Sequence, residues 1–171
     1  MIRALGAAMV LAATSGIGWR IAGSYRRRPA HLRALAQSVR LLQAEVEYSV
    51  MPLPEALRHV AMRADRTVAE LYRLAGEALA NVDVTVADAF RIGIDACTPR
   101  SALRSEDFDV MRELGATLGT SDSVHQSQQL DVALARLNSL EAMARELQQK
   151  NERMWQYLGV LSGLLIVILL Y

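Results

Sequence analysis

Apolar residues recur every three or four positions along most of the chain, which is the spacing of one face of an α-helix. The clearest example is residues 30–48, where an apolar stripe lies opposite Arg and Glu; its members are Leu32, Leu35, Val39, Leu42 and Val46. The same spacing recurs in EALRHVAMRA, TVAELYRLAGEAL, TVADAFRIGIDAC and FDVMRELGATLG. No segment alternates convincingly as a strand does, so the pattern predicts an all-α fold.

Breaks in the pattern separate these helices. Two prolines in VMPLPEAL end the first helix, and Pro54 can open the next within its first turn. Thr85 is the expected N-cap of a later helix, with Asp88 near its positive start. TPRSALRSED is predicted to be a turn, and Gly119 to stop a short helix. The breaks predict an antiparallel bundle of about six helices over residues 29–153.

The last helix is expected to start near Ser121 or Ser123, and no terminator follows it. A heptad pattern continues along it without a change of phase. One position holds Leu130, Leu137, Ala144, Asn151, Leu158 and Leu165, and the position three residues later holds Ala133, Leu140, Leu147, Met154, Leu161 and Ile168. The pattern predicts one continuous helix that joins the bundle to the apolar C-terminal segment.

The C-terminal segment, MWQYLGVLSGLLIVILLY at residues 154–171, carries no charge. As a helix it would be roughly 27 Å long, close to the hydrocarbon thickness of a bilayer. We therefore predict a transmembrane helix rather than a buried core helix, which usually has a polar face. Gly159 and Gly163 form a small-xxx-small pair and are candidates for packing against another membrane helix.

Residues 1–25 are also predominantly apolar and predict an N-terminal transmembrane anchor, although a cleaved signal peptide is the alternative. Arg26, Arg27 and Arg28 follow at once and resist translocation. They are also expected to attract anionic membrane lipids. Lys150 and Arg153 precede the second span, so both spans predict a helical domain in the cytoplasm and both termini across the membrane.

Composition argues against several functional classes. The 171 residues include 19 basic and 18 acidic side chains, and a net charge of +1 gives no excess to neutralise nucleic-acid phosphates. The histidines His31, His59 and His125 lack metal-ligand spacing, and no phosphate-binding loop is found, so no metal or cofactor is predicted. Cys97 or His125 could serve a hydrolase or thiol enzyme, but the sequence favours a protein that is not an enzyme.

A helical domain without an active site is expected to act by contact with partners. Loops at the ends of a bundle are accessible to partners, so we single out two of them as candidate partner surfaces. Their residues are Ser49, Pro52, Pro54, Gly119, Ser121 and Asp122.

Four stretches carry a resemblance that extends over nearly the whole chain. They are RPAHLRALAQSVRLLQAEVEY, PLPEAL just after it, ELGATLGTSD, and LGVLSGLLIVILLY at the C-terminus. In this order they resemble the stage III sporulation protein AB family of endospore-forming bacteria. One departure is visible, because the family has a glycine in the turn after the tyrosine, where this chain has Ser49, Val50 and Met51 after Tyr48.

The resemblance implies a protein of the mother cell, in the outer membrane around the forespore, that belongs to a channel-like complex with other stage III subunits. It also implies a cytoplasmic partner, a sporulation ATPase, and a helical domain similar to the platform protein of type II secretion and type IV pilus systems. Ser49–Leu57 and Glu113–Val124 are the expected counterparts of that platform's recurring stretches. We therefore predict a non-catalytic platform or adaptor; the alternative is a structural anchor that forms homo-oligomers through Gly159 and Gly163 without a motor partner.

Overall fold

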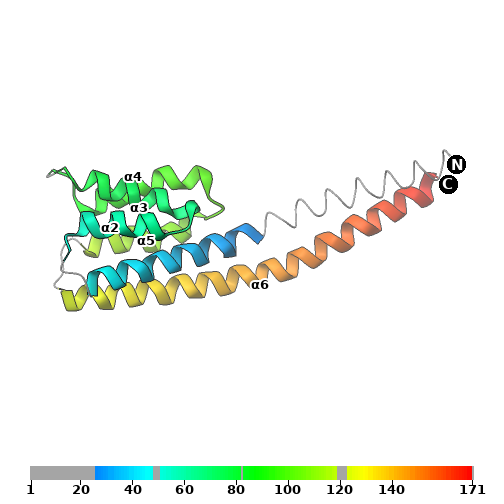
Figure 1. The fold of residues 1–171 in the computed structure, drawn as a ribbon. Helices are drawn as coiled ribbons and strands as arrows, with labels where there is room; N and C mark the ends of the chain where they lie inside the picture. The colour runs from blue at the N-terminus through cyan, green and yellow to red at the C-terminus, as the bar shows by residue number, and fades with distance from the viewer. Residues whose placement is uncertain (1–25, 48–50, 82, 119–122, 171) are drawn as a thin grey trace. The chain divides into compact units, whose positions relative to one another are not determined.

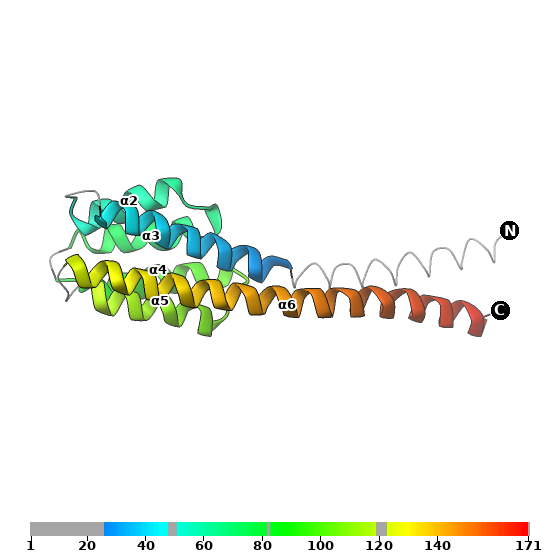
Figure 2. The same cartoon turned by 90° about the horizontal axis from the view of Figure 1, so that it is seen from below.

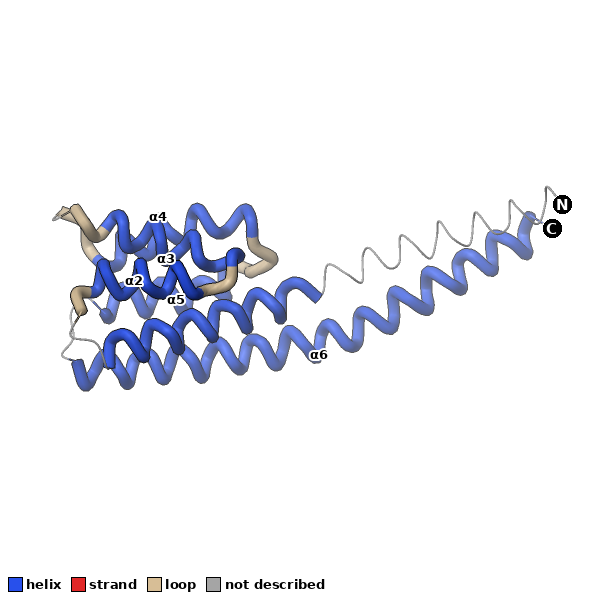
Figure 3. Tube along the Cα trace, in the orientation of Figure 1, coloured by secondary structure: helices blue, strands red, loops and turns tan. Residues whose placement is uncertain are grey.

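The computed structural model describes residues 26–47, 51–81, 83–118 and 123–170. Within these ranges the chain is helical over residues 26–47 and then forms five labelled α-helices and a short 3-10 turn, η1 (Figure 1). Their bounds are α2 (Leu53–Arg63), α3 (Arg66–Ala78), α4 (Val86–Cys97), η1 (Thr98–Arg100), α5 (Ser105–Leu118) and α6 (Ser123–Leu170). The described residues form no strand (Figure 3), so the all-α prediction is confirmed.

The chain divides into two compact units, which we consider separately. One unit is residues 30–142; the other combines residues 1–29 with residues 143–171. The larger unit contains α2 to α5 together with most of the helix over residues 26–47 and the first part of α6. The predicted domain boundaries after residues 25 and 153 stay predictions.

The helix starts show how the sequence divides the bundle. Pro54 lies in the first turn of α2, and the carbonyl of Pro52 accepts the Glu55 N–H at 2.9 Å. Thr85 caps α4 by accepting the Asp88 N–H at 3.1 Å, as expected for an N-cap threonine. Asp65 caps α3 in the same way, accepting the Thr67 N–H at 2.9 Å. The predictions for Pro54 and Thr85 are therefore confirmed.

The predicted turn TPRSALRSED is only partly a turn. Residues 98–100 form η1, and α5 already begins at Ser105, so the last residues of the stretch are helical. Asp107 is the reason for this early start, because its Oδ2 accepts the Arg104 N–H at 2.8 Å and satisfies a free donor ahead of the helix. Asp107 is also completely buried. The carboxylate therefore caps the helix from inside the protein.

Consecutive helices pack on one another: α3 contacts both α2 and α4, and α4 contacts α5. Glycines allow two of these close approaches. A Cβ atom on Gly93 of α4 would lie 2.3 Å from the Leu71 carbonyl oxygen of α3, and one on Gly115 of α5 would lie 2.8 Å from Phe90 of α4. Gly93 lets the backbones of α3 and α4 approach each other directly, whereas Gly115 makes room for the Phe90 side chain.

The core confirms the apolar stripe over residues 30–48. Leu32, Leu35, Val39 and Leu42 have no exposed surface, whereas Val46 is half-buried. They share the interior with the largest side chains of the other helices, which are Tyr72, Phe90, Phe108, Leu57, Leu71, Ile94, Met111, Leu130 and Leu137. Burial of this apolar surface is the main source of stability for the bundle.

Candidate functional site

The helix over residues 26–47 and the first part of α6 lie side by side and run in opposite directions (Figures 1 and 2). Arg33 Nε donates to Glu141 Oε1 at 3.0 Å, and Gln43 Nε2 donates to Asp131 Oδ1 at 3.0 Å. The residue later in the first helix, Gln43, therefore pairs with the residue earlier in α6, Asp131. Residues 30 and 142 therefore lie at the same end of the larger unit, so the chain enters and leaves this unit at one end.

Polar contacts connect the helix ends at the opposite end of this unit. Ser127 Oγ donates to Glu47 Oε1, and Gln126 Nε2 donates to the Leu118 carbonyl oxygen at 3.1 Å. The bond from Ser127, followed by that from Gln43, holds the pKa of the Glu47 carboxyl below its usual value. These contacts hold the starts and ends of three helices together, next to the predicted loop surfaces.

The structure describes only part of the predicted partner surface. Pro52 is exposed and Pro54 is half-buried, both at the start of α2. Ser49, Gly119, Ser121 and Asp122 lie outside the described residues. Gly159 and Gly163 lie within α6, but their surroundings are not described. The expected partner and packing roles of these residues stay predictions.

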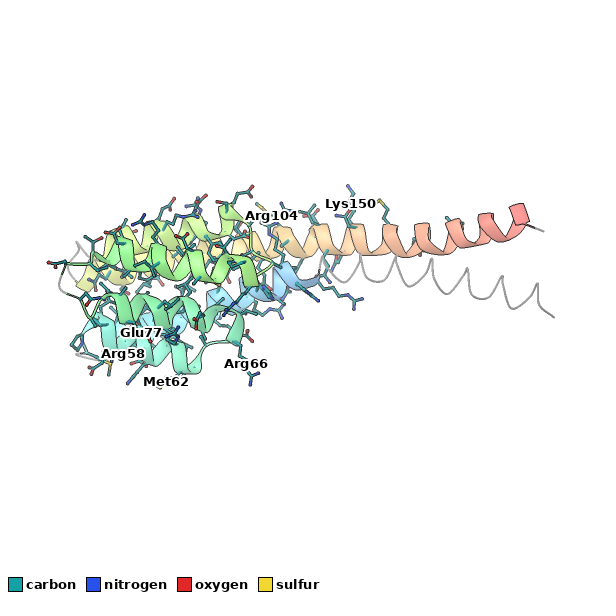
Figure 4. All side chains as sticks on the ribbon, turned by 90° about the horizontal axis from the view of Figure 1, so that it is seen from above. Arg58, Met62, Arg66, Glu77, Arg104 and Lys150 are labelled. Atoms are coloured by element: carbon teal, nitrogen blue, oxygen red, sulfur yellow. The ribbon has the colours of Figure 1, made fainter. Side chains whose placement is uncertain are left out.

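A groove that sequence reasoning missed lies between α2 and α3, with a volume of about 650 Å3. Met62, with 74% of its surface exposed, lies in this groove. The side chains of Arg58, Met62 and Arg66 project along the same side of the bundle (Figure 4). The complete lining is Glu55, Arg58, His59, Ala61, Met62, Arg66, Thr67, Ala69, Glu70, Arg73, Glu77 and Arg100.

An ion-pair network occupies the α3 side of this groove. Arg73 bonds Glu70 through two nitrogens, at 2.9 and 2.7 Å, and bonds Glu77 at 2.6 Å. The bond from Arg73 is the largest cause that lowers the pKa of Glu70, and bonds from Glu70 and then Glu77 raise the pKa of the Arg73 guanidinium. Arg73 is therefore committed to its own helix, and Arg58 Nε donates to the Pro54 carbonyl oxygen at 3.4 Å.

Cys97 is poorly suited to nucleophilic chemistry. The thiol is buried, and its Sγ lies 3.0 Å from the Thr67 carbonyl oxygen, to which it donates. Burial raises the pKa of the Cys97 thiol, whereas a reactive cysteine needs a lowered one. The bond instead joins the end of α4 to the start of α3, which is a structural role.

His31 and His59, the two histidines whose side chains the structure describes, have separate contacts. His31 Nδ1 accepts the Ala102 N–H at 2.9 Å, and His59 Nδ1 lies 3.9 Å from Glu45 Oε2. The side chain of His125 lies outside the described residues. Within the part of the chain that the structure describes, no three His, Cys, Asp or Glu side chains are grouped to hold a metal ion.

The described helices were predicted to include part of a membrane span. None of the helices in the described residues combines the length and the apolar character that a bilayer crossing needs. Residues 1–25 and most side chains of residues 154–171 lie outside the described set. Both predicted spans stay predictions.

Comparison with known proteins decides the family. The sequence model of stage III sporulation protein AB matches residues 3–171. The chain belongs to the stage III sporulation protein AB family. Stage III sporulation protein AB of Bacillus subtilis (strain 168) is 31% identical over 170 residues, which covers 99% of each chain. The resemblance seen in the sequence is therefore confirmed.

A solved structure of a stage III sporulation protein AB is also similar to this chain. The TM-score is 0.67 at 25% identity, and the match covers 72% of this chain and 98% of the other. The names of these stage III sporulation protein AB relatives refer to sporulation, and neither denotes an enzymatic activity.

The α2–α3 groove left one signal in the sequence. Arg58 and Met62 lie four residues apart on the same face of α2, and Arg66 begins α3 directly after the break at residues 64–65. A methionine between two arginines on a polar face is typical of a protein interface, because Met and Arg are enriched there. The pattern alone could not show that α3 closes the other side of the groove.

Proposed function

We propose that this protein is a membrane-anchored, non-catalytic platform subunit of a stage III sporulation complex. Its helical bundle would face the mother-cell cytoplasm and bind a secretion-type ATPase, while its two apolar ends span the membrane around the forespore. Family membership supports the assignment to sporulation, and the resemblance to secretion platforms supports the choice of partner.

One observation carries the proposed topology. The antiparallel pairing of Arg33 with Glu141 and of Gln43 with Asp131 places residues 30 and 142 at the same end of the larger unit. The apolar sequences at residues 1–25 and 154–171 therefore continue from that one end. A domain with both apolar extensions at one end can sit on one side of a membrane with two anchors in it.

The chemistry of the described residues supports an adaptor rather than a thiol enzyme. The Cys97 thiol is buried, donates to a backbone carbonyl and has a raised pKa. A nucleophilic thiol needs partial exposure and electropositive neighbours that favour the thiolate. The groove between α2 and α3, with its exposed methionine and arginines, is suited to contact with another protein.

The first test is a topology map of the full-length protein in membranes. Single cysteines are placed near residues 2 and 170 and at Val132, which is 59% exposed, in a Cys97→Ser background. We expect a membrane-impermeant thiol reagent to label position 132 from the cytoplasmic side and the two terminal positions from the opposite side. Labelling of position 132 from outside, or loss of residue 2 from the mature chain, would overturn the two-span topology.

The second test addresses the motor partner. The full-length protein, purified in detergent, is mixed with the sporulation ATPase in nucleotide-free, ADP-bound and ATP-bound states. We expect binding in at least one state. A lack of binding in all three, together with intact topology, would favour the structural anchor that assembles without a motor.

A further inference from the structure

The groove between α2 and α3 has charged side chains at both ends, and Arg58 lies with the glutamates at the end near Gly76. At one end, the start of α2 meets the end of α3, since a Cβ atom on Gly76 would lie 3.0 Å from the Pro54 carbonyl oxygen. Glu55 and Glu77 line this end. At the other end, α3 begins at Arg66, and η1 brings Arg100 beside it, because Cys97 bonds Thr67 just before η1 starts.

The cationic end holds two arginines that form no ion pair within the described residues. Neither Arg66 nor Arg100 forms an ion pair with a carboxylate of the described residues, and both are exposed. Both charges act on nearby carboxylates without bonding them. Arg66 lowers the pKa of Asp65 and Arg100 lowers the pKa of Glu70, each as a minor cause. A carboxylate from outside could approach both guanidinium groups.

The mixed charge of the groove argues against a nucleic acid or an anionic membrane as its occupant. Glu55, Glu70 and Glu77 line the same groove as the arginines, and a dense polyanion would be repelled by them. A protein segment can instead place carboxylates at one end and a basic or neutral residue at the other. Charge complementarity therefore favours a protein.

Met62 supplies an apolar contact beside the cationic end. It lies in the last turns of α2, and 74% of its surface is exposed. Methionine adapts its shape to different apolar partners, and helices commonly bind in grooves between two helices through such contacts. The 11 residues of α2 give a groove of roughly 16 Å, the length of about three helical turns.

We propose that the α2–α3 groove binds an amphipathic helix of the partner ATPase. This helix presents carboxylates to Arg66 and Arg100 and an apolar side chain to Met62. The inference rests on the proposed function, and it assigns the contact to a surface distinct from the loops at residues 49–54 and 119–122 that the sequence favoured.

The test measures the affinity of the full-length protein in detergent for the purified ATPase. The groove variants are Met62→Glu, Arg66→Glu and Arg100→Glu. Matched controls on α4 are Ile92→Glu and Arg91→Glu, since both residues are exposed and neither lines the groove. We expect each groove variant to weaken binding about tenfold or more, and each control to bind within about twofold of the wild type.

Several controls separate the possible outcomes. Arg66→Lys keeps the charge and should retain most of the binding, and equal thermal unfolding of all variants would exclude misfolding as the cause. Wild-type protein that fails to bind would overturn the proposed function, and the groove inference with it. If the wild type binds the ATPase and the groove variants bind it with the same affinity, the groove inference alone would be overturned.

A photo-crosslink identifies the occupant directly. A benzoylphenylalanine at position 62 of the full-length protein is irradiated with the ATPase present. A crosslink to a helical ATPase segment that carries carboxylates would support the proposal. A crosslink to a second copy of this chain, or to lipid, would overturn it.

Discussion

The hydroxyl groups of Ser38 and Tyr72 lie 2.9 Å apart and form a hydrogen bond in the core of the larger unit. Both residues are fully buried, Ser38 on the helix over residues 26–47 and Tyr72 on α3. Ser38 Oγ also lies 2.7 Å from the Leu35 carbonyl oxygen, to which it bonds. Burial raises the pKa of Tyr72, and the bond to Ser38 opposes this shift. Ser38 therefore has two partners, and Tyr72 relies on Ser38.

Because of this difference, we expect removal of the Ser38 hydroxyl to lower the free energy of unfolding more than removal of the Tyr72 hydroxyl. Ser38→Ala leaves the Tyr72 hydroxyl buried without its partner, and we expect a loss of about 1–3 kcal/mol in the free energy of unfolding. Tyr72→Phe leaves Ser38 bonded to the Leu35 carbonyl, so the loss should be smaller, about 1 kcal/mol or less. Urea unfolding followed by circular dichroism measures both. Equal losses would show that Tyr72 finds another partner.

The crossing of α3 and α4 predicts a large effect at Gly93. The Cβ atom of Gly93→Ala would meet the Leu71 carbonyl oxygen at 2.3 Å, so the helices must separate, at a cost of about 1–3 kcal/mol. Gly76→Ala is the matched control, because its closest contact is 3.0 Å and its next is the flexible Arg58 side chain. We expect the melting temperature to fall clearly more for Gly93→Ala. A reversed order would contradict the packing of α3 on α4.

The N-cap of α3 predicts a pH-dependent contribution to stability. Bonds from the Thr67 side chain and then its backbone N–H lower the pKa of Asp65. A lowered pKa means that the contribution is present above the unfolded value near 3.8 and is lost as pH falls through the folded value. At pH 7, Asp65→Ala should cost about 0.5–2 kcal/mol. The difference in unfolding free energy between the wild type and Asp65→Ala should become smaller as pH drops below about 4.

Asp65→Asn is the control for this pH dependence, since asparagine caps a helix without titrating. The stability difference between Asp65→Asn and Asp65→Ala should stay constant as pH falls, whereas the difference between the wild type and Asp65→Ala should shrink. Thermal unfolding of the three proteins between neutral and acidic pH measures the effect. A wild-type advantage that stays constant with pH would contradict the lowered pKa.

The ion pair between Arg33 and Glu141 predicts coupling between the first described helix and α6. Arg33→Glu places two carboxylates together and should destabilise the bundle, whereas Arg33→Glu with Glu141→Arg should restore most of the loss. The pair is partly exposed, so we expect a coupling energy of about 0.2–1 kcal/mol that falls with added salt. A double-mutant cycle measures it. Absence of rescue at low salt would contradict the antiparallel pairing.

The sequence predicted the elements of the fold well because local chemistry defines them. The apolar spacing of Leu32, Leu35, Val39 and Leu42 predicted their burial, and Thr85 predicted the start of α4. The start of α5 was predicted too late because the side chain of Asp107 satisfies a backbone donor before the apolar pattern begins. The Asp107 carboxylate makes this bond from a buried position, and the turn-forming residues in the sequence do not indicate that burial.

The heptad pattern shows the limit of periodicity. Leu130, Leu137 and Ala144 of this pattern are buried, but Leu147 is 45% exposed and Leu161 is 63% exposed, although the spacing does not change. Periodicity predicts that one face of a helix is apolar, but it does not predict what covers that face.

The groove shows the same limit for function. Arg58 and Met62 are visible as neighbours on consecutive turns of α2, but Arg100 lies far along the sequence and reaches the groove only because α4 packs on α3. Such a site depends on which helices are neighbours, and hydrophobic spacing does not specify that. The loops predicted at residues 49–54 and 119–122 were easier to single out because prolines and a glycine mark them in the sequence.

The contact between Arg33 and Glu141 joins residues separated by 108 positions in the sequence. A ribosome adds about 5–20 residues per second, so α6 reaches its partner helix about 5–20 s after that helix has been made. During that interval the edge of the nascent bundle that later receives α6 is uncovered beside the synthesis machinery. Biogenesis of this protein therefore has a built-in delay, because the helical bundle is complete only when its last helix has been made.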